Sequence, residues 1–243
     1  MSGGKTILPY SNEDSTMPGQ LNILSAGAVS PGLVRVIDAF RRETGDNVIV
    51  SFATAPELRK RLASGEPADI VIAPPELLDE LTKSGRAAAE RVMVGRIGVG
   101  VMVRDGAPLP GIATVEELKQ SLLNCDSIVF NQASTGLYID SLFMRLGIAA
   151  QTEAKIIRCG DFTAVRDHLS KGQSNAIGFG ATTVIVASSD KGVKFAGPLP
   201  AEIQNYTAYA AALTSSAGNH AAAFLDYLAT PAAKLILTSV GID

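Results

Sequence analysis

Residues 21–33 constrain the fold of this chain more than any other stretch. An apolar run is followed by a turn that contains Gly27, and then by the start of an amphipathic helix. This order predicts a short buried strand, a tight turn and a helix. A turn of this kind directs backbone N–H groups and the positive end of the helix dipole toward one small volume. The segment therefore favours the capture of a small anion over bond-making chemistry.

Segments typical of strands and helices alternate along the residues that follow. Apolar residues within 33–40 recur at helical spacing, and Gly45 supplies a stop. Residues 48–53 and 69–73 read as strands, and the second is a continuous apolar run suited to the centre of a parallel sheet. This order predicts a parallel sheet with right-handed crossovers.

A second alternating set follows a long β-rich segment at residues 96–103. The length of that segment and its two glycines, Gly98 and Gly100, suit a strand that crosses between lobes, and residues 206–213 read as the return strand. We therefore expect an α/β fold of two lobes, each a mostly parallel sheet flanked by helices, joined by two crossing strands. The expected division is a disordered lead-in at residues 1–20, lobe I at residues 21–98 and 206–243, and lobe II at residues 99–205.

Composition and charge exclude several classes of partner. The chain has 243 residues, of which 47% are hydrophobic and 19% charged, as in a packed α/β protein. The net charge is −3 and no dense basic run occurs, which argues against nucleic acid because phosphate contacts need clustered Lys and Arg. No apolar run approaches the ~20 residues of a membrane span. We expect a monomer without membrane insertion.

The first twenty residues are polar and lack the apolar core of a secretory signal. Two locations stay open on this observation. The protein is cytoplasmic if Met1 is the native start, and periplasmic if a signal peptide has been removed ahead of it.

The cysteines and histidines do not form a metal-binding pattern. Cys125 and Cys159 lack the spacing of a metal site, and His168 and His220 are not clustered with them. We expect two reduced, buried thiols, although a disulfide in an oxidising compartment stays open. No metal or other cofactor is expected.

Four strand-to-helix turns carry glycine or small hydroxyl residues. In open parallel sheets, ligands bind beyond the carboxyl ends of strands, where helices begin. Donors from several such turns could therefore surround one anion without a basic side chain, at about 1 kcal/mol for each uncharged hydrogen bond. The turns lie at residues 25–32, 53–56, 133–138 and 160–163.

Each hydroxyl in these turns also has a purely structural explanation. Ser30 and Thr54 suit helix N-caps, which would account for their residue types without a ligand. Ser134 and Thr135 are the strongest ligand candidates because their loop is rich in small residues, and Gly136 would let a ligand approach the backbone. The basic residues at 59–61 are read as a solvated helix face.

Seven short motifs carry a family resemblance. They are LSAGA at 24–28, FATAP at 52–56, GEPADIVI at 65–72, STGLY at 134–138, AIGFG at 176–180, QNYTAY at 204–209 and YLATPAAK at 227–234. On these motifs, residues 21–243 resemble the molybdate-binding component of bacterial ABC transporters, within the type 2 periplasmic binding-protein class. The resemblance implies two lobes that close over an oxyanion held by hydroxyls and backbone amides.

The resemblance also extends the set of candidate ligand-binding residues. It implies contacts after the first strand, at the start of the second helix, and in the third and fourth loops. Ala28 stands where the family has a hydroxyl residue, and Gly180 stands where the family has a tyrosine after the last strand. The site therefore lacks two of the family's hydrogen-bond donors and has room for an organic carboxylate. The full set is Ser25, Ala28, Ser30, Thr54, Ala55, Ser134, Thr135, Gly136, Thr163 and Gly180.

The expected function is that of a small-anion solute-binding protein of the ABC-transporter type, molybdate-like, with an ABC permease as a candidate partner. Two alternatives stay open: an isomerase acting on a carboxylate such as aconitate, because aconitate isomerase is similar to this class, and a cytoplasmic ligand sensor. The nearest titratable candidates are Tyr138, Cys159, Asp161 and Tyr206, and no pair among them stands out. No catalytic residue is therefore assigned, and binding is favoured over catalysis.

Overall fold

The computed structural model describes residues 20–172, 175–218 and 220–243. The expected lead-in at residues 1–20 lies outside the described residues, apart from Gln20 at the start of the first strand.

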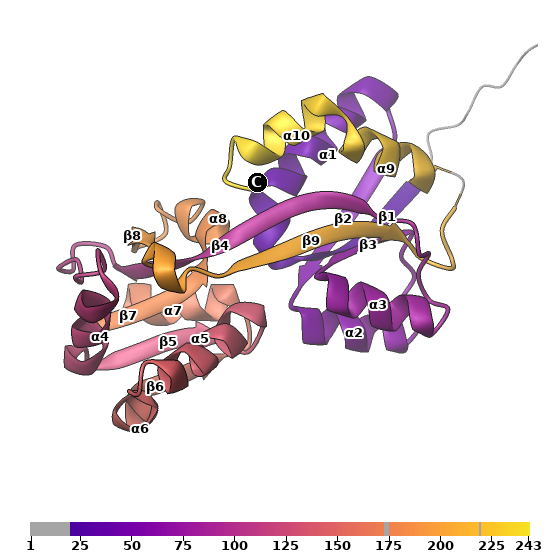
Figure 1. Cartoon of the computed structure of the whole chain (residues 1–243). Helices are drawn as coiled ribbons and strands as arrows, with labels where there is room; N and C mark the ends of the chain where they lie inside the picture. Colours follow the sequence, from indigo (N-terminus) through magenta and orange to yellow (C-terminus); the bar gives the residue numbers. More distant parts are fainter. Residues whose placement is uncertain (1–19, 173–174, 219) are drawn as a thin grey trace, which may run out of the picture.

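Strands and helices alternate along the described chain (Figure 1). The strands are β1 Gln20–Ala26, β2 Asn47–Ala53, β3 Ile70–Ala73, β4 Val92–Arg104, β5 Ser127–Asn131, β6 Ile156–Cys159, β7 Ala176–Ala181, β8 Val193–Pro198 and β9 Tyr206–Leu213. The α-helices are α1 Ser30–Thr44, α2 Ala55–Ala63, α3 Pro75–Lys83, α4 Val115–Asn124, α5 Ser134–Arg145, α6 Ala149–Thr152, α7 Phe162–Lys171, α8 Thr182–Val186, α9 Ala221–Ala229 and α10 Pro231–Thr238. Short 3-10 helices lie at η1 Gly27–Val29, η2 Glu153–Lys155 and η3 Ala201–Ile203.

The strands of the described residues form one nine-stranded mixed sheet in the order β2-β1-β3-β9-β4-β7-β5-β6, with β8 paired to β4. Strand β1 is parallel to β2 and β3, and β5 is parallel to β6 and β7. The antiparallel pairs all involve β4 or β9. We name the half that contains β1, β2, β3 and β9 lobe I, and the half that contains β5, β6, β7 and β8 lobe II.

Strand β4 belongs to both lobes. Its first half, up to Gly98, pairs with β9, and its second half, from Val99, pairs with β7 and β8. The return segment is held beside it by Gln204, whose side chain accepts a hydrogen bond from the Val99 amide and donates one to the Val99 carbonyl, each at 3.0 Å. Figure 1 shows β4 and β9 running together from one lobe to the other.

Each lobe buries its own apolar core. In lobe I, helices α1, α9 and α10 cover one face of the sheet and α2 and α3 cover the other (Figure 1), with Phe40 and Phe224 edge to face at 5.1 Å between ring centroids. In lobe II, Phe143 packs between Phe130 and Phe179. Because each apolar cluster lies within one lobe, the lobes can keep their shapes while the angle between them changes.

No single helix among the described residues is long and apolar enough to cross a membrane. Taken together, α9 and α10 pass that test by length and composition, with a bend of 68° between them. Both helices bury apolar residues in the core of lobe I, including Phe224, Leu228 and Leu237.

Candidate anion-binding cleft

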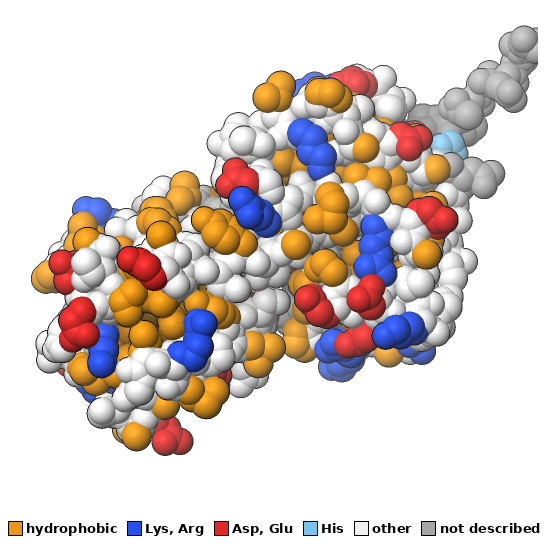
Figure 2. Space-filling view, viewed as in Figure 1, with side chains coloured by type: hydrophobic (Ala, Val, Ile, Leu, Met, Phe, Trp, Pro, Cys, Tyr) orange, Lys and Arg blue, Asp and Glu red, His pale blue; other side chains and the backbone are white. Residues whose placement is uncertain are grey.

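A cleft of about 740 Å³ lies between the lobes, at the carboxyl ends of their parallel strands. Figure 2 shows the narrow waist that separates the lobes and, on that face, positive and negative side chains interspersed over both. Most of the lining residues are uncharged. From lobe I they include Ala26, Gly27, Ala28, Ser30, Phe52, Ala53, Thr54, Ala55, Pro74 and Tyr209, and from lobe II Asn131, Ala133, Ser134, Thr135, Gly160, Phe162, Thr163, Ala181 and Val184.

The lobe I wall is built by the starts of α1 and α2. Thr54 is the N-cap residue of α2, yet its side chain makes no capping hydrogen bond. Ser30 is the first residue of α1, whose N-cap residue is Val29. The alternative reading of these two hydroxyls as capping groups therefore does not hold, and both line the cleft. The first backbone N–H groups of a helix also lack partners within the helix, so both helix starts offer amide donors.

The lobe II wall is built by the starts of α5 and α7. Ala133 is the N-cap residue of α5 and provides no side-chain cap, while Ser134 and Thr135 in the first turn line the cleft. Asn131 closes the preceding turn by accepting a hydrogen bond from the Ala133 amide at 3.1 Å. At α7, Asp161 caps the helix by accepting from the Ala164 amide at 2.8 Å, and the exposed Thr163 lines the cleft beside it.

Seven of the ten candidate residues line this cleft, and three lie behind its wall. Ser25 is fully buried and its hydroxyl donates to the Ala26 carbonyl at 3.3 Å. A Cβ at Gly136 would lie 1.7 Å from the Asn131 carbonyl oxygen, and one at Gly180 would lie 2.8 Å from the Phe162 ring. These glycines permit close packing, and their contact with a ligand stays a prediction.

One link between the lobes runs beside the cleft. Thr183, at the start of α8, is buried and donates a hydrogen bond from its hydroxyl to the Ala28 carbonyl at 2.6 Å. Because η1 belongs to lobe I and α8 follows a strand of lobe II, this bond joins the two lobes at the edge of the site. The Ala28 carbonyl is thereby occupied.

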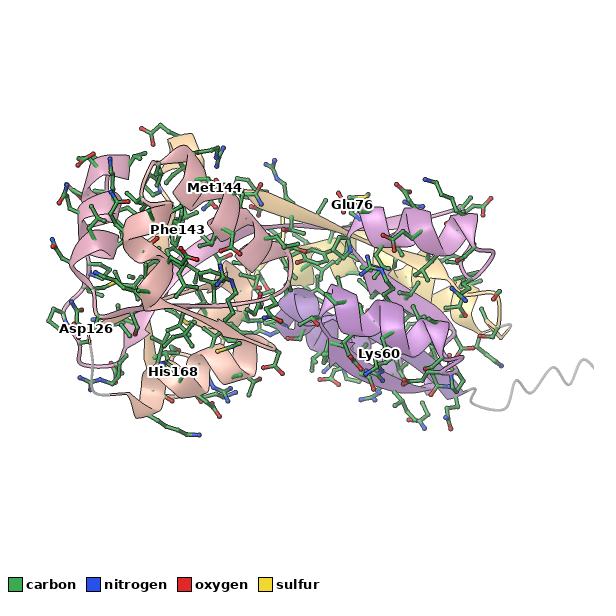
Figure 3. All side chains as sticks on the ribbon, turned by 90° about the horizontal axis from the view of Figure 1, so that it is seen from below. Lys60, Glu76, Asp126, Phe143, Met144 and His168 are labelled. Carbon is green, nitrogen blue, oxygen red and sulfur yellow. The ribbon has the colours of Figure 1, made fainter. Side chains whose placement is uncertain are left out.

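The charged residue Arg61 lines the cleft, contrary to its reading as part of a solvated face. Lys60, labelled in Figure 3, has a side chain 80% exposed, and that of Arg59 is 50% exposed, whereas that of Arg61 is only 22% exposed. Arg61 lies seven residues after Thr54, two helical turns along the same face. That spacing is the sequence signal that places it toward the cleft.

Arg61 forms a bidentate ion pair with Glu66. Its Nε donates to one carboxylate oxygen at 2.7 Å and its Nη2 donates to the other. These hydrogen bonds hold the pKa of the Glu66 carboxyl below its usual value. Glu66 therefore stays ionised and orients the guanidinium beside the cleft.

Two carboxylates also line the cleft, one on each lobe. Glu57 lies 3.9 Å from the ammonium group of Lys60, and Asp161 serves as the cap of α7. Of the four titratable candidates taken from the sequence, only Asp161 is a lining residue. Tyr138 donates its hydroxyl to the Ile203 carbonyl, and Tyr206 lies under the Arg96 guanidinium at 4.9 Å.

Tyr209 lines the cleft from the crossing strand β9 and is absent from the candidate set. It is 6% exposed, and burial raises the pKa of its hydroxyl to about 12. The group is therefore neutral at physiological pH and can donate a hydrogen bond. The motif at 204–209 contains this residue, but its orientation depends on the register of β9 against β3 and β4.

The thiols and imidazoles contribute little to the cleft. Cys125 and Cys159 are both free, and Cys125 is buried as expected whereas Cys159 is only half-buried. Burial raises the pKa of each thiol, so neither is activated as a nucleophile. His168, labelled in Figure 3, lies exposed on α7. Across residues 20–172, 175–218 and 220–243, no group of three His, Cys, Asp or Glu side chains could hold a metal ion.

The fold and the cleft define a two-lobed binding protein, and comparison with known proteins gives the family. The chain belongs to the bacterial extracellular solute-binding protein family, whose model matches residues 21–243. The resemblance to molybdate-binding proteins of this class is confirmed.

Two curated proteins are similar to the chain over most of its length. An aconitate isomerase from Pseudomonas sp is 28% identical over 233 residues, which cover 91% of this chain and 87% of that protein. The molybdate-binding protein ModA from Escherichia coli (strain K12) is 23% identical over 230 residues, covering 92% of this chain and 88% of that protein.

A solved structure confirms the fold class. The periplasmic molybdate-binding protein from Azotobacter vinelandii superposes with a TM-score of 0.76 at 19% sequence identity, covering 92% of this chain and 98% of that one. The two-lobed type 2 periplasmic binding-protein fold is therefore shared.

Proposed function

We propose that this protein captures a small anion, an oxyanion or an organic carboxylate, by closing its two lobes around it. The observation that carries the proposal is the convergence of four helix starts, two from each lobe, on one cleft. Their hydroxyls line that cleft, at Ser30 of α1, Thr54 of α2, Ser134 and Thr135 of α5, and Thr163 of α7. Membership of the solute-binding family supports the same reading.

The physical basis of binding is a set of aligned dipoles. Helix N-termini carry positive partial charge and unpaired N–H groups, so they stabilise an anion without a basic side chain in contact with it. Hydrogen bonds to a charged acceptor are stronger than neutral ones, at about 1.5–3 kcal/mol each. A ligand that contacts both walls binds the closed state better than the open one and so shifts the protein toward closure.

The partner that fits this role is the permease of an ABC transporter. When a binding protein closes on its ligand, its surface differs from that of the open form. A permease can therefore bind the closed form in preference to the open one. A solved structure described as the tungstate ABC transporter from Geobacter sulfurreducens supports the assignment, with a TM-score of 0.70 at 14% sequence identity over 90% of this chain and 98% of that one.

A second candidate function is isomerisation of a carboxylate. The similarity to an aconitate isomerase over 91% of the chain favours it, as does the presence of Glu57, Asp161 and Tyr209 along the cleft. Isomerisation would require a general acid or base within reach of the substrate. Interconversion of cis- and trans-aconitate, followed by proton NMR with purified protein, would support this function over simple binding.

Calorimetric titration with molybdate, tungstate, sulfate, phosphate, citrate and trans-aconitate tests the primary proposal. We expect at least one of these anions to bind with one-to-one stoichiometry, and Ser134→Ala to weaken that binding. Thr238→Val, in an exposed threonine on α10 away from this cleft, is the control and should leave the affinity unchanged. Equal weakening by both variants, or no binding by any anion, would oppose the proposal.

A further inference from the structure

Arg61 is the one basic side chain among the described residues that line the cleft. It is also the least exposed of the three basic residues on α2. Its Nε and Nη2 groups are both bonded to Glu66. A guanidinium has five N–H donors, and within the described part of the chain the Nη1 group of Arg61 has no hydrogen-bond partner. Arg61 can therefore donate hydrogen bonds to a second carboxylate while it stays paired with Glu66.

The position of Arg61 on α2 sets its distance from the amide donors. Thr54 and Arg61 lie on one face of the helix, seven residues apart, and both line the cleft. At a rise of 1.5 Å per residue, their Cα atoms are about 10 Å apart along the helix axis, and the long arginine side chain can shorten the gap. The wall thus has an uncharged, dipolar end and a cationic end within the span of one small molecule.

The cleft has more space than a single oxyanion fills. A tetrahedral oxyanion has four oxygens, and four water molecules in the liquid occupy about 120 Å³. The cleft measures about 740 Å³, within the range of sites that bind organic ligands. Small residues, Ala28, Ala55 and Ala133, stand at three helix starts where side chains could otherwise contact the ligand.

The two lining carboxylates restrict where a second negative charge can lie. Asp161 stands on the lobe II side at the cap of α7, and Glu57 stands one turn before Arg61. Both repel a ligand carboxylate, and because Glu57 is close enough to Arg61 to act on it electrostatically, the Arg61 guanidinium offsets the repulsion from Glu57 as well as attracting the ligand. Because guanidinium and carboxylate match in bidentate geometry, the Arg61 end is the favourable place for it.

From these observations we propose that Arg61 is a specificity-determining residue, which selects anions that carry a second carboxylate. One carboxylate lies at the helix starts near Thr54 and Thr135, and the other pairs with Arg61. The inference rests on the proposed function, since it assigns a ligand class to the same cleft. Its chemistry is that of short di- and tricarboxylates.

Calorimetry with tricarballylate, succinate, acetate and sulfate tests the inference on four forms of the full chain. We expect Arg61→Gln to weaken tricarballylate and succinate binding at least tenfold and to change sulfate and acetate binding less than twofold. Arg59→Gln is the matched control, because Arg59 lies on the same helix as Arg61 and forms an equivalent bidentate pair with Glu80 of α3, but does not line the cleft. It should change none of the four affinities.

Glu66→Gln gives a second, independent readout. It removes a negative charge beside Arg61 and keeps a side-chain oxygen that can still accept from its Nε, so we expect tricarballylate to bind at least threefold more tightly while sulfate binding stays unchanged. This variant keeps the inference testable if Arg61→Gln does not fold.

The outcomes separate the inference from the proposed function. Tight binding of sulfate with no binding of tricarballylate or succinate would overturn the inference and leave the proposed function standing. So would an equal loss for all anions in Arg61→Gln, or no loss for any. If no anion binds the wild-type protein, the proposed function itself fails.

Discussion

At the scale of single residues, the cleft is marked by a hydroxyl side chain that makes no helix-capping hydrogen bond. Thr114 and Thr230 accept hydrogen bonds from Glu117 and Ala233 amides as helix caps, whereas the Thr54 side chain makes no such bond at the equivalent position of α2. The difference separates a hydroxyl that stabilises a helix from one that is free to bind a ligand.

Thr135→Val should weaken anion binding about tenfold or more. The substitution keeps the shape of the side chain and removes one donor to a charged ligand, a bond worth about 1.5–3 kcal/mol. Calorimetry with the tightest-binding anion measures the loss. An affinity within twofold of the wild type would mean that Thr135 does not touch the ligand.

Ionisation of Tyr209 should lower the free energy of unfolding at high pH. Burial raises the pKa of its hydroxyl to about 12 in the folded protein, above the value near 10 of an unfolded chain. The folded protein therefore keeps a proton that the unfolded chain releases, so the contribution is complete below pH 10 and is lost as the pH rises toward 12. Relative to Tyr209→Phe, urea unfolding should show a loss of about 1 kcal/mol at pH 11. Parallel pH profiles for the two proteins would contradict this.

At the scale of elements, the junction between β5 and α5 depends on one glycine. A Cβ at Gly136 would lie 1.7 Å from the Asn131 carbonyl oxygen, so Gly136→Ala must displace α5 from the end of β5. We expect a loss of about 2 kcal/mol or more in the free energy of unfolding, measured by urea denaturation. Gly160→Ala, where an added Cβ meets nothing within 4 Å, is the control and should cost less than about 1 kcal/mol.

The long periodic elements were predictable from the sequence, and the short ones were not. Apolar spacing and Gly45 locate α1, and a continuous apolar run locates β3. Strand β8 was missed because Val193–Pro198 contains a glycine and ends in proline, and it pairs only with the crossing strand β4. Helices α6 and α8 are four and five residues long, too short for a periodic signal.

The cleft was predictable only in part. Small hydroxyl residues at strand-to-helix turns pointed to Thr54 and Thr135 because that pattern is local. Arg61 lines the same cleft because of the face of α2 on which it lies, and Tyr209 because of the register of β9. Both depend on how whole elements pack. Ser25 is a hydroxyl residue, as expected of a ligand contact, but it is fully buried. Both faces of the sheet are covered at this end of β1, where the last four residues are all buried.

At the scale of the whole molecule, the connection between the lobes is made by β4 and by the return segment that leads into β9. β4 pairs in both lobes, and Gln204 ties the return segment to Val99 at the change of lobe. Two covalent crossings and the Thr183 to Ala28 hydrogen bond therefore connect otherwise separate cores. Such an arrangement favours rotation of one lobe against the other over unfolding of either.

Closure should be visible in solution. We expect small-angle X-ray scattering to show a smaller radius of gyration when the tightest-binding anion saturates the protein. At an anion concentration near the wild-type dissociation constant, Thr135→Val should show a smaller decrease because less of it is bound. An unchanged radius in the saturated wild-type protein would argue for a rigid site.

A crystal structure of the protein with its tightest-binding anion tests the central claim most directly. We expect the anion between the starts of α2 and α5, in contact with Thr54 on one lobe and Thr135 on the other, in a cleft smaller than about 740 Å³. An anion bound outside this cleft, or held by one lobe alone with the cleft as open as it is now, would contradict the account.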